Sequence, residues 1–383
     1  MAGANDRTYG QWWDWRGAYE TLAIEPLRQL CEEAYVVAGA SPDDAAFLVA
    51  GTLDKTVQGD HARGVVYVPA TVNAARRGQQ DLAAPISVRR NKPAAAVVDG
   101  GPLAAGRLVC RRGMQVAIEA AHEHGAAVVG ARGAAGLLTQ FVQMAIDEGM
   151  VGLVMTQTGP CVAPLGSYKA FLGNGPFAAG VPARRHEPVI VDMSFTHTSA
   201  SGVILAAEQN EVLPPGMLLD AAGNPTTDPN DFREVNRGKS PTEAGGIGTL
   251  TALGNSHKGQ AMLMLIGLLS SVLSDTSPPW DLAPGPNRGT AGSVLIAIDP
   301  RALGIDDLAD RVDAFLDVIV NAPRRDGVAE ILYPGLKSQQ LRRERYQRGT
   351  VAVPAPQVAA LRALAAEFAT PAILAASERL HPT

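Results

Sequence analysis

The chain has 383 residues, of which 46% are hydrophobic and 19% charged, with a formal net charge of −5. This length is enough for two domains of ordinary size. The mild negative charge argues against a nucleic-acid-binding protein, which usually presents a basic face, and the composition is that of a soluble globular protein.

Cysteine usage and apolar runs indicate the compartment. Cys31, Cys110 and Cys161 stand apart with no Cys-x-x-Cys spacing, which is typical of a reducing compartment and argues against a disulfide framework or a zinc site. The first fifteen residues lack the apolar core of a signal peptide. Ala261–Leu273, the most apolar run, is too short to span a membrane, and we expect it to be a buried helix. We therefore expect a cytoplasmic protein without a bound metal.

Helical patterns dominate the first part of the chain. Apolar residues recur at helical spacing within Ala18–Ala50. Ser41 followed by Pro42 supplies an N-cap and a first-turn proline, which predicts a second helix that continues toward Val57. Tyr67–Arg77 is predicted to form a third helix, stopped by the glycine that follows it.

Strand patterns dominate the centre, where short apolar runs are bounded by glycine or proline. The predicted strands are Ala94–Val98, Ala126–Gly130, Val151–Thr156, Phe177–Val181, Val189–Asp192 and Ser293–Asp299. The predicted helices of this part and of the C-terminal part are Arg107–His124, Thr139–Glu148, His257–Ser274, Ile305–Asn321 and Gln357–Phe368. Because helices and strands do not alternate regularly, a doubly wound parallel sheet is not favoured.

Two polar residues are candidates for acid–base chemistry. His61 lies in a bend bounded by glycines, Gln58–Gly64, where a histidine can donate a proton near neutral pH and Asp60 could hold its tautomer. The plain alternative is a polar surface turn. Asp192 ends the strand Val189–Asp192 and could orient a histidine, or it could simply cap the turn that follows.

Glycine-rich segments are candidates for a cofactor site. Leu172–Pro176 and Leu253–Gly259 each place glycine beside an amide side chain, which lets the backbone approach an anionic ligand, and Lys258 adds a positive charge. Ser256 is also a good N-cap, so a structural role is equally open. The turn Gly130–Gly136 is more simply a strand–helix connection. None of them is the G-x-G-x-x-G of a Rossmann site.

In their order along the chain, these segments resemble the malate/L-lactate dehydrogenase family of non-Rossmann oxidoreductases. That group also holds ureidoglycolate, sulfolactate and cyclic imino acid reductases. The resemblance runs from about Leu22 to Gly349. It is carried by Asp60-His61, Gly133-Ala134-Ala135-Gly136, Ala163–Gly166, Leu172–Pro176, the strand that ends in Asp192, Asp220–Thr226, His257-Lys258-Gly259 and Tyr333-Pro334-Gly335.

The resemblance implies the architecture. The expected fold is α/β (α+β) and non-Rossmann, with a central, mostly antiparallel sheet domain and a helical domain built from both chain ends. Residues 126–259 would bind NAD(P). Residues 1–125 with 260–383 would bind substrate and dimerise, so the resemblance implies a homodimer. The charge and the short apolar run, and not the resemblance, argue against a nucleic-acid or membrane partner.

The resemblance also implies the activity and the site. The expected enzyme is an NAD(P)H-dependent reductase that transfers hydride to the C=N or C=O of a small imino acid or 2-oxo acid, with NADP or NAD as cofactor. His61 would be the proton donor, Asp192 would orient or charge it, and Arg63 or Arg132 would hold a substrate carboxylate. The residues expected around the cofactor are Gly133, Thr156, Gly173, Asn174, His257, Lys258 and Gly259.

The candidate proton-donor loop departs from the family pattern. The family usually has Ser-His-Gly, whereas here His61 is followed by Ala62. A register anchored on Gly64 would put Arg63 in the place of the family's histidine. The arginine that usually follows a turn later falls near Val65, and Arg63 is the residue available to replace it.

A second departure lies at the nicotinamide. The family's Asn-Ser-x-His-Phe-Gly is replaced by Val128–Gly133, which removes a histidine and places Arg132 beside the ring. Both changes touch the substrate side, so we expect a substrate other than plain malate or lactate. A cofactor-binding paralogue without catalysis, a 2-hydroxy acid dehydrogenase of the malate/lactate type and an isomerase that uses the same pocket are the alternatives.

Overall fold

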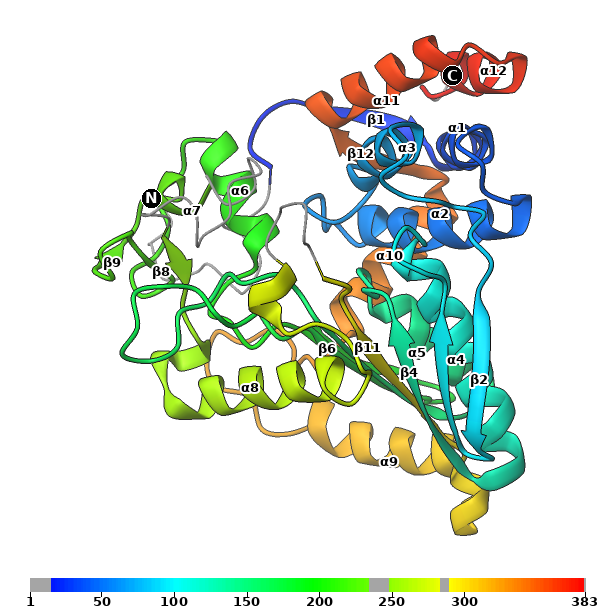
Figure 1. Cartoon of the computed structure of the whole chain (residues 1–383), viewed down its shortest axis with the longest axis vertical. Helices are drawn as coiled ribbons and strands as arrows, with labels where there is room; N and C mark the ends of the chain where they lie inside the picture. Colours follow the sequence, from blue (N-terminus) through cyan, green and yellow to red (C-terminus); the bar gives the residue numbers. More distant parts are fainter. Residues whose placement is uncertain (1–14, 234–247, 283–288, 382–383) are drawn as a thin grey trace.

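A seven-stranded sheet forms the centre of the computed structural model, which describes residues 15–233, 248–282 and 289–381 (Figure 1). Its strands, in spatial order, are β2 (Ser87–Lys92), β3 (Ala95–Asp99), β4 (Ala126–Arg132), β11 (Ser293–Ile298), β5 (Val151–Thr156), β6 (Phe177–Val181) and β7 (Val189–Met193). Only β3 and β4 pair in parallel, and every other neighbouring pair is antiparallel. The expected mostly antiparallel sheet is therefore confirmed.

Helices cover both faces of this sheet. On one face, Leu295 of β11 lies opposite Val129 of β4 and Val154 of β5, and these side chains pack with α4 (Gly106–His124) and α5 (Thr139–Asp147) in one buried cluster. On the other face, α8 (His257–Ser271) packs on β5 and β11. The alternation of side chains along each strand sends neighbouring apolar residues into these two layers.

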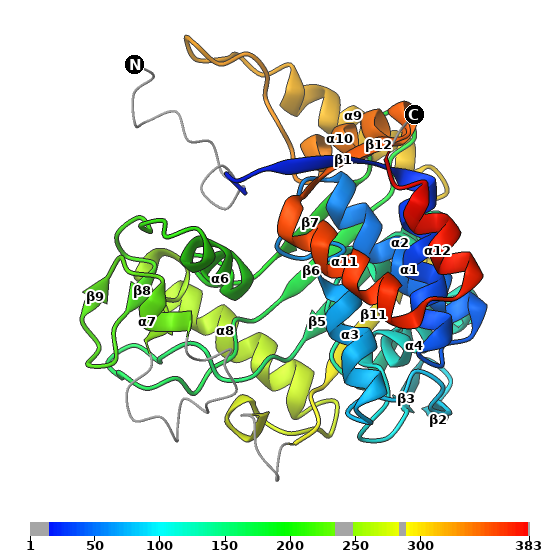
Figure 2. The ribbon, with the colours of Figure 1, turned by 90° about the horizontal axis from the view of Figure 1, so that it is seen from above.

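Described segments from the N-terminal and C-terminal parts of the chain come together in a second layer (Figures 1 and 2). Five helices form it with one short sheet, in which β1 (Tyr19–Ala23) pairs antiparallel with β12 (Thr350–Pro354). The helices are α1 (Ile24–Val37), α2 (Pro42–Val57), α3 (Tyr67–Arg76), α11 (Ala355–Phe368) and α12 (Pro371–Glu378). They share one buried core. The prediction of helix from Ala18 is wrong for β1, because these residues find a strand partner near the other end of the chain.

A third group of short elements lies beside α8. It contains a small sheet of β8 (Leu218–Leu219), β9 (Pro225–Thr226) and β10 (Thr249–Leu250), with α6 (Ala200–Glu208) and α7 (Asn230–Arg233). Short 3₁₀ helices lie at Leu253–Asn255, Pro279–Leu282 and Pro300–Leu303. Among the described residues, the remaining α-helices are α9 (Leu308–Val320) and α10 (Leu336–Arg348).

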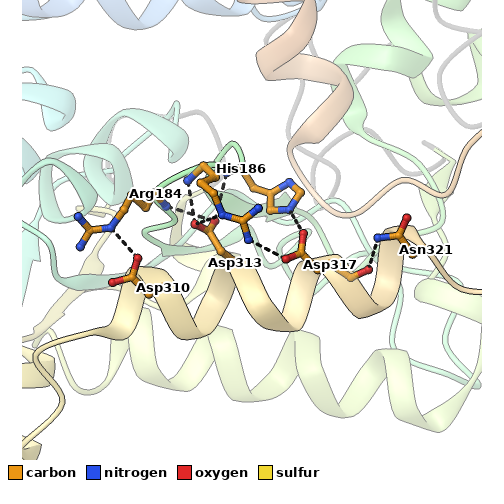
Figure 3. Close-up of polar contacts among 7 residues, drawn as sticks. Arg184, His186, Asp310, Asp313, Asp317 and Asn321 are labelled. Atoms are coloured by element: carbon orange, nitrogen blue, oxygen red, sulfur yellow. Dashed lines mark hydrogen bonds and ion pairs between the residues drawn. The ribbon is translucent and has the colours of Figure 1, made fainter.

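The turn between β6 and β7 is fastened to α9 by carboxylates (Figure 3). Asp313, only 1% exposed, accepts hydrogen bonds from the backbone amides of Arg184, Arg185 and His186 at 3.3, 2.8 and 3.1 Å. Asp317 accepts from the His186 ring at 2.8 Å. These contacts fix the start of β7, the edge strand of the central sheet.

The central sheet contains strands from both sides of the predicted domain boundaries. The strands β2 and β3 precede residue 126 and β11 follows residue 259, yet all three belong to the central sheet. The helices of both chain ends do share one core. The division into 1–125 with 260–383 and 126–259 stays a prediction.

The apolar helix α8 is buried on one side only. Ile266 is 1% exposed, whereas Leu268 is 55% exposed. The expectation that the whole run Ala261–Leu273 is buried is therefore wrong. Among the described helices, none is long and apolar enough to cross a bilayer.

Candidate functional site

A cavity of about 350 Å³ lies where α2 and the loop after it face β7, α5 and the start of α10. Its lining residues are Lys55, Gln58, Asp60, Arg63, Thr139, Ile190, Val191, Asp192, Met193, Pro334, Gly335, Ser338 and Gln339. Gly335 has φ +93°, and a Cβ there would lie 3.1 Å from the amide nitrogen of Ile190. Only glycine therefore lets the start of α10 lie this close to β7 and close the cavity.

Asp192, on β7, is held by residues from two helices. Lys55 Nζ donates to Asp192 Oδ2 at 2.8 Å and to Thr139 Oγ1 at 3.0 Å. The Thr139 hydroxyl donates to the same carboxylate oxygen at 2.5 Å. The Lys55 and Asp192 side chains are only 9% and 13% exposed. One ion pair thus ties the last turn of α2 to the sheet edge, with the first residue of α5 between them.

The carboxylate of Asp192 is ionised at neutral pH. Burial by itself would raise the pKa of Asp192, but the positive charges of Lys55 and Arg63 and the hydrogen bonds from Lys55 and Thr139 outweigh burial and lower this pKa to about 2. Asp192 can therefore stabilise a nearby positive charge or orient a donor. It has no proton of its own to give.

Arg63 lines the same cavity from the loop after α2. One of its terminal nitrogens, Nη2, lies 2.7 Å from Asp60 Oδ2. Its buried Nε has no hydrogen-bond partner in the part of the chain that the structure describes. Since a guanidinium carries five N–H groups in a planar fork, the pair with Asp60 leaves donors for a planar anion such as a carboxylate.

His61 is not among the residues that line this cavity. Its ring lies edge-on to Tyr19, with 5.4 Å between the ring centres, and its carbonyl accepts from Gln357 Nε2 at 2.8 Å. Burial lowers the pKa of His61 to about 4, and the charge of Arg345 adds to this while Asp60 opposes it. The imidazole is uncharged at neutral pH. Arg63 rather than His61 is thus brought next to Asp192, and the proton-donor role of His61 stays a prediction.

Arg132 lies away from the cavity, at the end of β4. Its guanidinium is 3.1 Å from the carboxylate of Asp99 and 2.5 Å from that of Asp275. Two carboxylates thus already hold Nη1 and Nη2, while the buried Nε has no partner among the described residues. Its predicted contact with substrate stays a prediction.

Gly133 and Thr156 are brought together by one buried network. The Thr156 hydroxyl accepts from the amide of Ala135 at 3.0 Å and lies 2.7 Å from the Ser293 hydroxyl, which donates to the carbonyl of Gly133 at 2.7 Å. A Cβ on Gly133 would lie 2.9 Å from Gly106 Cα. These residues shape the turn after β4, and the sequence pattern alone did not indicate Ser293.

Gly173 and Asn174 lie in a second network, around Thr158. The Thr158 hydroxyl donates to Asn174 Oδ1 at 2.8 Å and accepts from the backbone N–H of Asn174 at 3.0 Å. A Cβ on Gly173 would lie 2.6 Å from that hydroxyl. Gly173 is therefore required by packing within the protein.

The start of α8 presents two of the predicted cofactor residues to solvent. His257 and Lys258 are exposed, whereas Gly259 is buried and donates its amide to the capping hydroxyl of Ser256 at 3.3 Å. A Cβ on Gly259 would lie 2.3 Å from the carbonyl oxygen of Leu253. Gly259 thus permits the tight turn that leaves Lys258 free to contact an anion.

Unsatisfied polar atoms lie beside the segment that leads into α8. Thr196 pairs with Ala252, and the amide of His197 donates to the carbonyl of Thr251 at 3.0 Å. The buried Nδ1 of His197 and Oγ1 of Thr198 have no partner among the described residues. Buried polar atoms are rarely left unpaired, so these atoms and the cationic helix start fit a ligand that carries both phosphate and polar groups.

Four residues of these sites are not predicted from the sequence: Lys55, Thr139, His197 and Thr198. Lys55 and Thr139 read as ordinary residues of amphipathic helices, and only the packing of α2 and α5 against β7 makes them neighbours of Asp192. A lysine in the last turn of a helix is common because it complements the helix dipole. The sequence therefore contains no signal that separates Lys55 from a surface lysine.

The chain is similar along most of its length to one family of known proteins. Residues 22–362 match the model of the malate/L-lactate dehydrogenase family. The L-sulfolactate dehydrogenase of Methanothermobacter thermautotrophicus is 30% identical over 319 residues, which cover 79% of this chain and 85% of that protein. The Delta(1)-pyrroline-2-carboxylate reductase of Ancylobacter novellus is 28% identical over 355 residues, 90% of this chain and 97% of the relative. The malate dehydrogenase structure from Entamoeba histolytica superposes with a TM-score of 0.84 at 19% identity, covering 92% of this chain and 99% of that one.

Proposed function

The chain belongs to the malate/L-lactate dehydrogenase family, and from this premise we propose that it is an NAD(P)H-dependent reductase that acts on a small imino acid or 2-oxo acid in the cavity around Asp192. The observation that carries the proposal is the constellation of Asp192, Lys55 and Arg63 in one cavity. The names of two relatives, a sulfolactate dehydrogenase and a pyrroline-2-carboxylate reductase, support small anionic substrates of both kinds.

Substrate binding is assigned to Arg63. A substrate carboxylate would replace water at the guanidinium donors that Asp60 leaves unused, in the bidentate geometry that arginine favours. Asp192, ionised and paired with Lys55, keeps this end of the cavity from binding a second anion. Arg132 is retained as a second candidate, although binding there would have to displace Asp99 or Asp275.

The cofactor site is assigned to the start of α8 and its neighbours. Lys258 and the free amides of the helix start would hold phosphate, with His257 beside them, and His197 and Thr198 offer unpaired polar atoms. The remaining predicted residues, Gly133, Thr156, Gly173, Asn174 and Gly259, would shape the backbone that borders the cofactor. Reduced nicotinamide supplies a hydride to the C=O or C=N carbon when it is bound.

The proton that must accompany the hydride has two candidate sources. The resemblance assigns it to His61. That role requires a protonated ring that reaches the cavity, whereas the ring lies against Tyr19 and burial lowers its pKa to about 4. The second source is a side chain that lines the cavity.

Cofactor titration and turnover test the proposal. NADPH or NADH binding should quench or shift nicotinamide fluorescence, and Lys258→Met should weaken binding by about tenfold or more, as expected for loss of one phosphate contact. Oxidation of the reduced cofactor should follow addition of at least one member of a panel of 2-oxo acids and cyclic imino acids. Asp192→Asn should lower turnover by about 100-fold or more, with Asp310→Asn on α9 as the control.

A cofactor-binding protein without catalysis is the second candidate. Arg63 in the expected place of a histidine favours it, since a guanidinium stays charged and is a poor proton donor. Tight binding of NADPH without oxidation across the whole panel would establish this alternative. Oxidation of 2-hydroxy acids by NAD(P)⁺, without reduction of imines, would instead establish a malate/lactate-type dehydrogenase.

We also propose a cytoplasmic homodimer. The three cysteines are free and buried, which suits a reducing compartment. The helices α8 and α9 leave large apolar side chains exposed, among them Leu265, Leu268, Phe315 and Val318, and such patches mark protein interfaces. Sedimentation equilibrium should give twice the chain mass, and a monomer at micromolar concentration would contradict the proposal.

A further inference from the structure

We propose that Lys55 is the residue that donates the proton to the heteroatom of the substrate, positioned by Asp192 and Thr139. This inference rests on the proposed reductase function. The role belongs to a side chain that nothing in the sequence singles out, and it replaces the imidazole expected from the family.

The geometry leaves one N–H of Lys55 for a ligand. A lysine ammonium has three N–H donors and no acceptor. Two of them are used, one toward Asp192 at 2.8 Å and one toward Thr139 at 3.0 Å. Both partners come from the wall of the cavity that Lys55 itself lines, so the third donor is the one available to a bound substrate.

The other charged groups of the cavity lining are unsuited to the role. Among the described lining residues they are Asp60, Arg63 and Asp192. Arg63 keeps its proton at every pH at which enzymes work, and Asp60 is ion-paired with it at 2.7 Å. Asp192 is ionised under the charges of Lys55 and Arg63. Lys55 is the remaining group in the described lining that can give up a proton and take it back.

Transfer of one proton from Lys55 completes the two-electron reduction of the substrate. As the C=O or C=N carbon gains hydride, the π electrons move to the oxygen or nitrogen, which then takes a proton from Lys55 Nζ. The N–H bond breaks, its electron pair stays on nitrogen as a neutral amine, and the new O–H or N–H bond completes the alcohol or amine. The buried charge of Asp192 is then unpaired, which favours return of a proton from solvent to Lys55.

A structural role would not require these residues. An ion pair this far buried gains little stability, because the cost of removing both charges from water offsets their attraction. An apolar contact between α2 and β7 would join the two elements equally well. The pair is therefore better explained by a task that needs an exchangeable proton beside a fixed negative charge.

Matched variants of Lys55 separate proton donation from charge. Lys55→Arg keeps the positive charge beside Asp192 but holds its proton too tightly to donate it, and Lys55→Met removes the charge. We expect both variants to lose about 100-fold or more in kcat, while the Kd for NADPH, measured by fluorescence, stays within about threefold. Lys337→Met, at an exposed lysine on the nearby helix α10, is the control that keeps wild-type turnover.

Chemical rescue guards against a folding defect. None of the three native cysteines lines the cavity, whereas Lys55→Cys places a thiol on its wall, within reach of a small reagent. Alkylation with 2-bromoethylamine restores an ammonium at this position, whereas iodoacetamide adds a neutral amide of similar size. Recovery of turnover with the first reagent only is the result expected.

Thr139 and Asp192 position Lys55. Substitution of Thr139 tests this positioning role without removing a charge from the cavity. Thr139→Val keeps the shape but loses the hydroxyl that contacts Lys55 and Asp192. We expect kcat to fall by about tenfold with KM unchanged, and Thr139→Ser to recover it, since a proton-donor geometry depends on that hydroxyl.

These experiments separate failure of the Lys55 role from failure of the proposed reductase function. Wild-type turnover in Lys55→Arg, or equal rescue of Lys55→Cys by both reagents, would overturn the role of Lys55 and leave the reductase function standing. Absence of cofactor oxidation in the wild-type protein across the substrate panel would overturn both.

Discussion

His61 and Arg63 lie two residues apart in one bend and meet different surroundings. Arg63 reaches the cavity and pairs with Asp60, whereas His61 packs against Tyr19. The sequence predicts the bend and its polar residues. It cannot predict which side chain enters the cavity, because that depends on β1 and α11, which come from opposite ends of the chain.

The buried imidazole should make stability depend on pH. His61 has a folded-state pKa of about 4 against 6.5 in a model compound, so only the unfolded chain gains a proton between these values. The contribution of His61 to the free energy of unfolding is therefore fully present above pH 6.5. It is lost as the pH decreases toward 4, by about 3 kcal/mol in total. Urea unfolding of His61→Gln should lose this part of the pH dependence.

The exposed His124 supplies the control for that series. His124→Gln should show the same loss of stability between pH 6.5 and 4 as the wild-type protein. A wild-type slope retained in His61→Gln would show that the ring is solvated or otherwise paired.

Arg63 should act mainly in substrate binding. Arg63→Lys keeps the charge but loses the planar fork, so we expect KM for the acid substrate to rise by about tenfold or more with a smaller change in kcat. Steady-state kinetics measure both, with Arg184→Lys, on the turn fastened to α9, as the control. A lower kcat at unchanged KM would contradict a binding role.

At the scale of elements, the attachment of α9 to the turn before β7 depends on one buried carboxylate (Figure 3). Asp313→Ala removes the acceptor of three backbone amides. We expect a loss of about 2–4 kcal/mol in the free energy of unfolding, because buried donors would be left without partners.

Asp310 on the same helix is the matched control. It pairs with Arg184 at 2.7 Å, but both side chains are more than half exposed, and such pairs contribute about 0–1 kcal/mol. Equal losses for Asp310→Ala and Asp313→Ala in urea unfolding would show that the buried hydrogen bonds do not fasten the turn.

Element prediction succeeds where local signals are sufficient. Ser41 caps α2 through the amide of Asp44, as expected, and α4 ends at Gly125 with φ +84°. It fails for β1, whose only strand partner in the described chain is β12. It also fails for the exposed face of α8, because an apolar run does not reveal which side a neighbour covers.

At the scale of the whole molecule, the mostly antiparallel sheet and the shared core of both chain ends follow the expected fold. Local periodicity predicts most strands, and the order of motifs predicts their assembly. The cavity is different, since its walls come from α2, α5, β7 and α10. Asp192 and Arg63 could be named from sequence, but Lys55 and Thr139 could not, because only tertiary packing brings them together.

We propose that reduction takes place in the cavity shared by Lys55, Arg63 and Asp192. A crystal structure of the protein with NADPH and oxamate, a non-reducible analogue of a 2-oxo acid with a single carboxylate, tests this directly. We expect the oxamate carboxylate to contact Arg63 and its amide group to lie within hydrogen-bond distance of Lys55 Nζ, with the nicotinamide ring facing it. A dinucleotide bound elsewhere, or oxamate held against the ring of His61, would contradict this proposal.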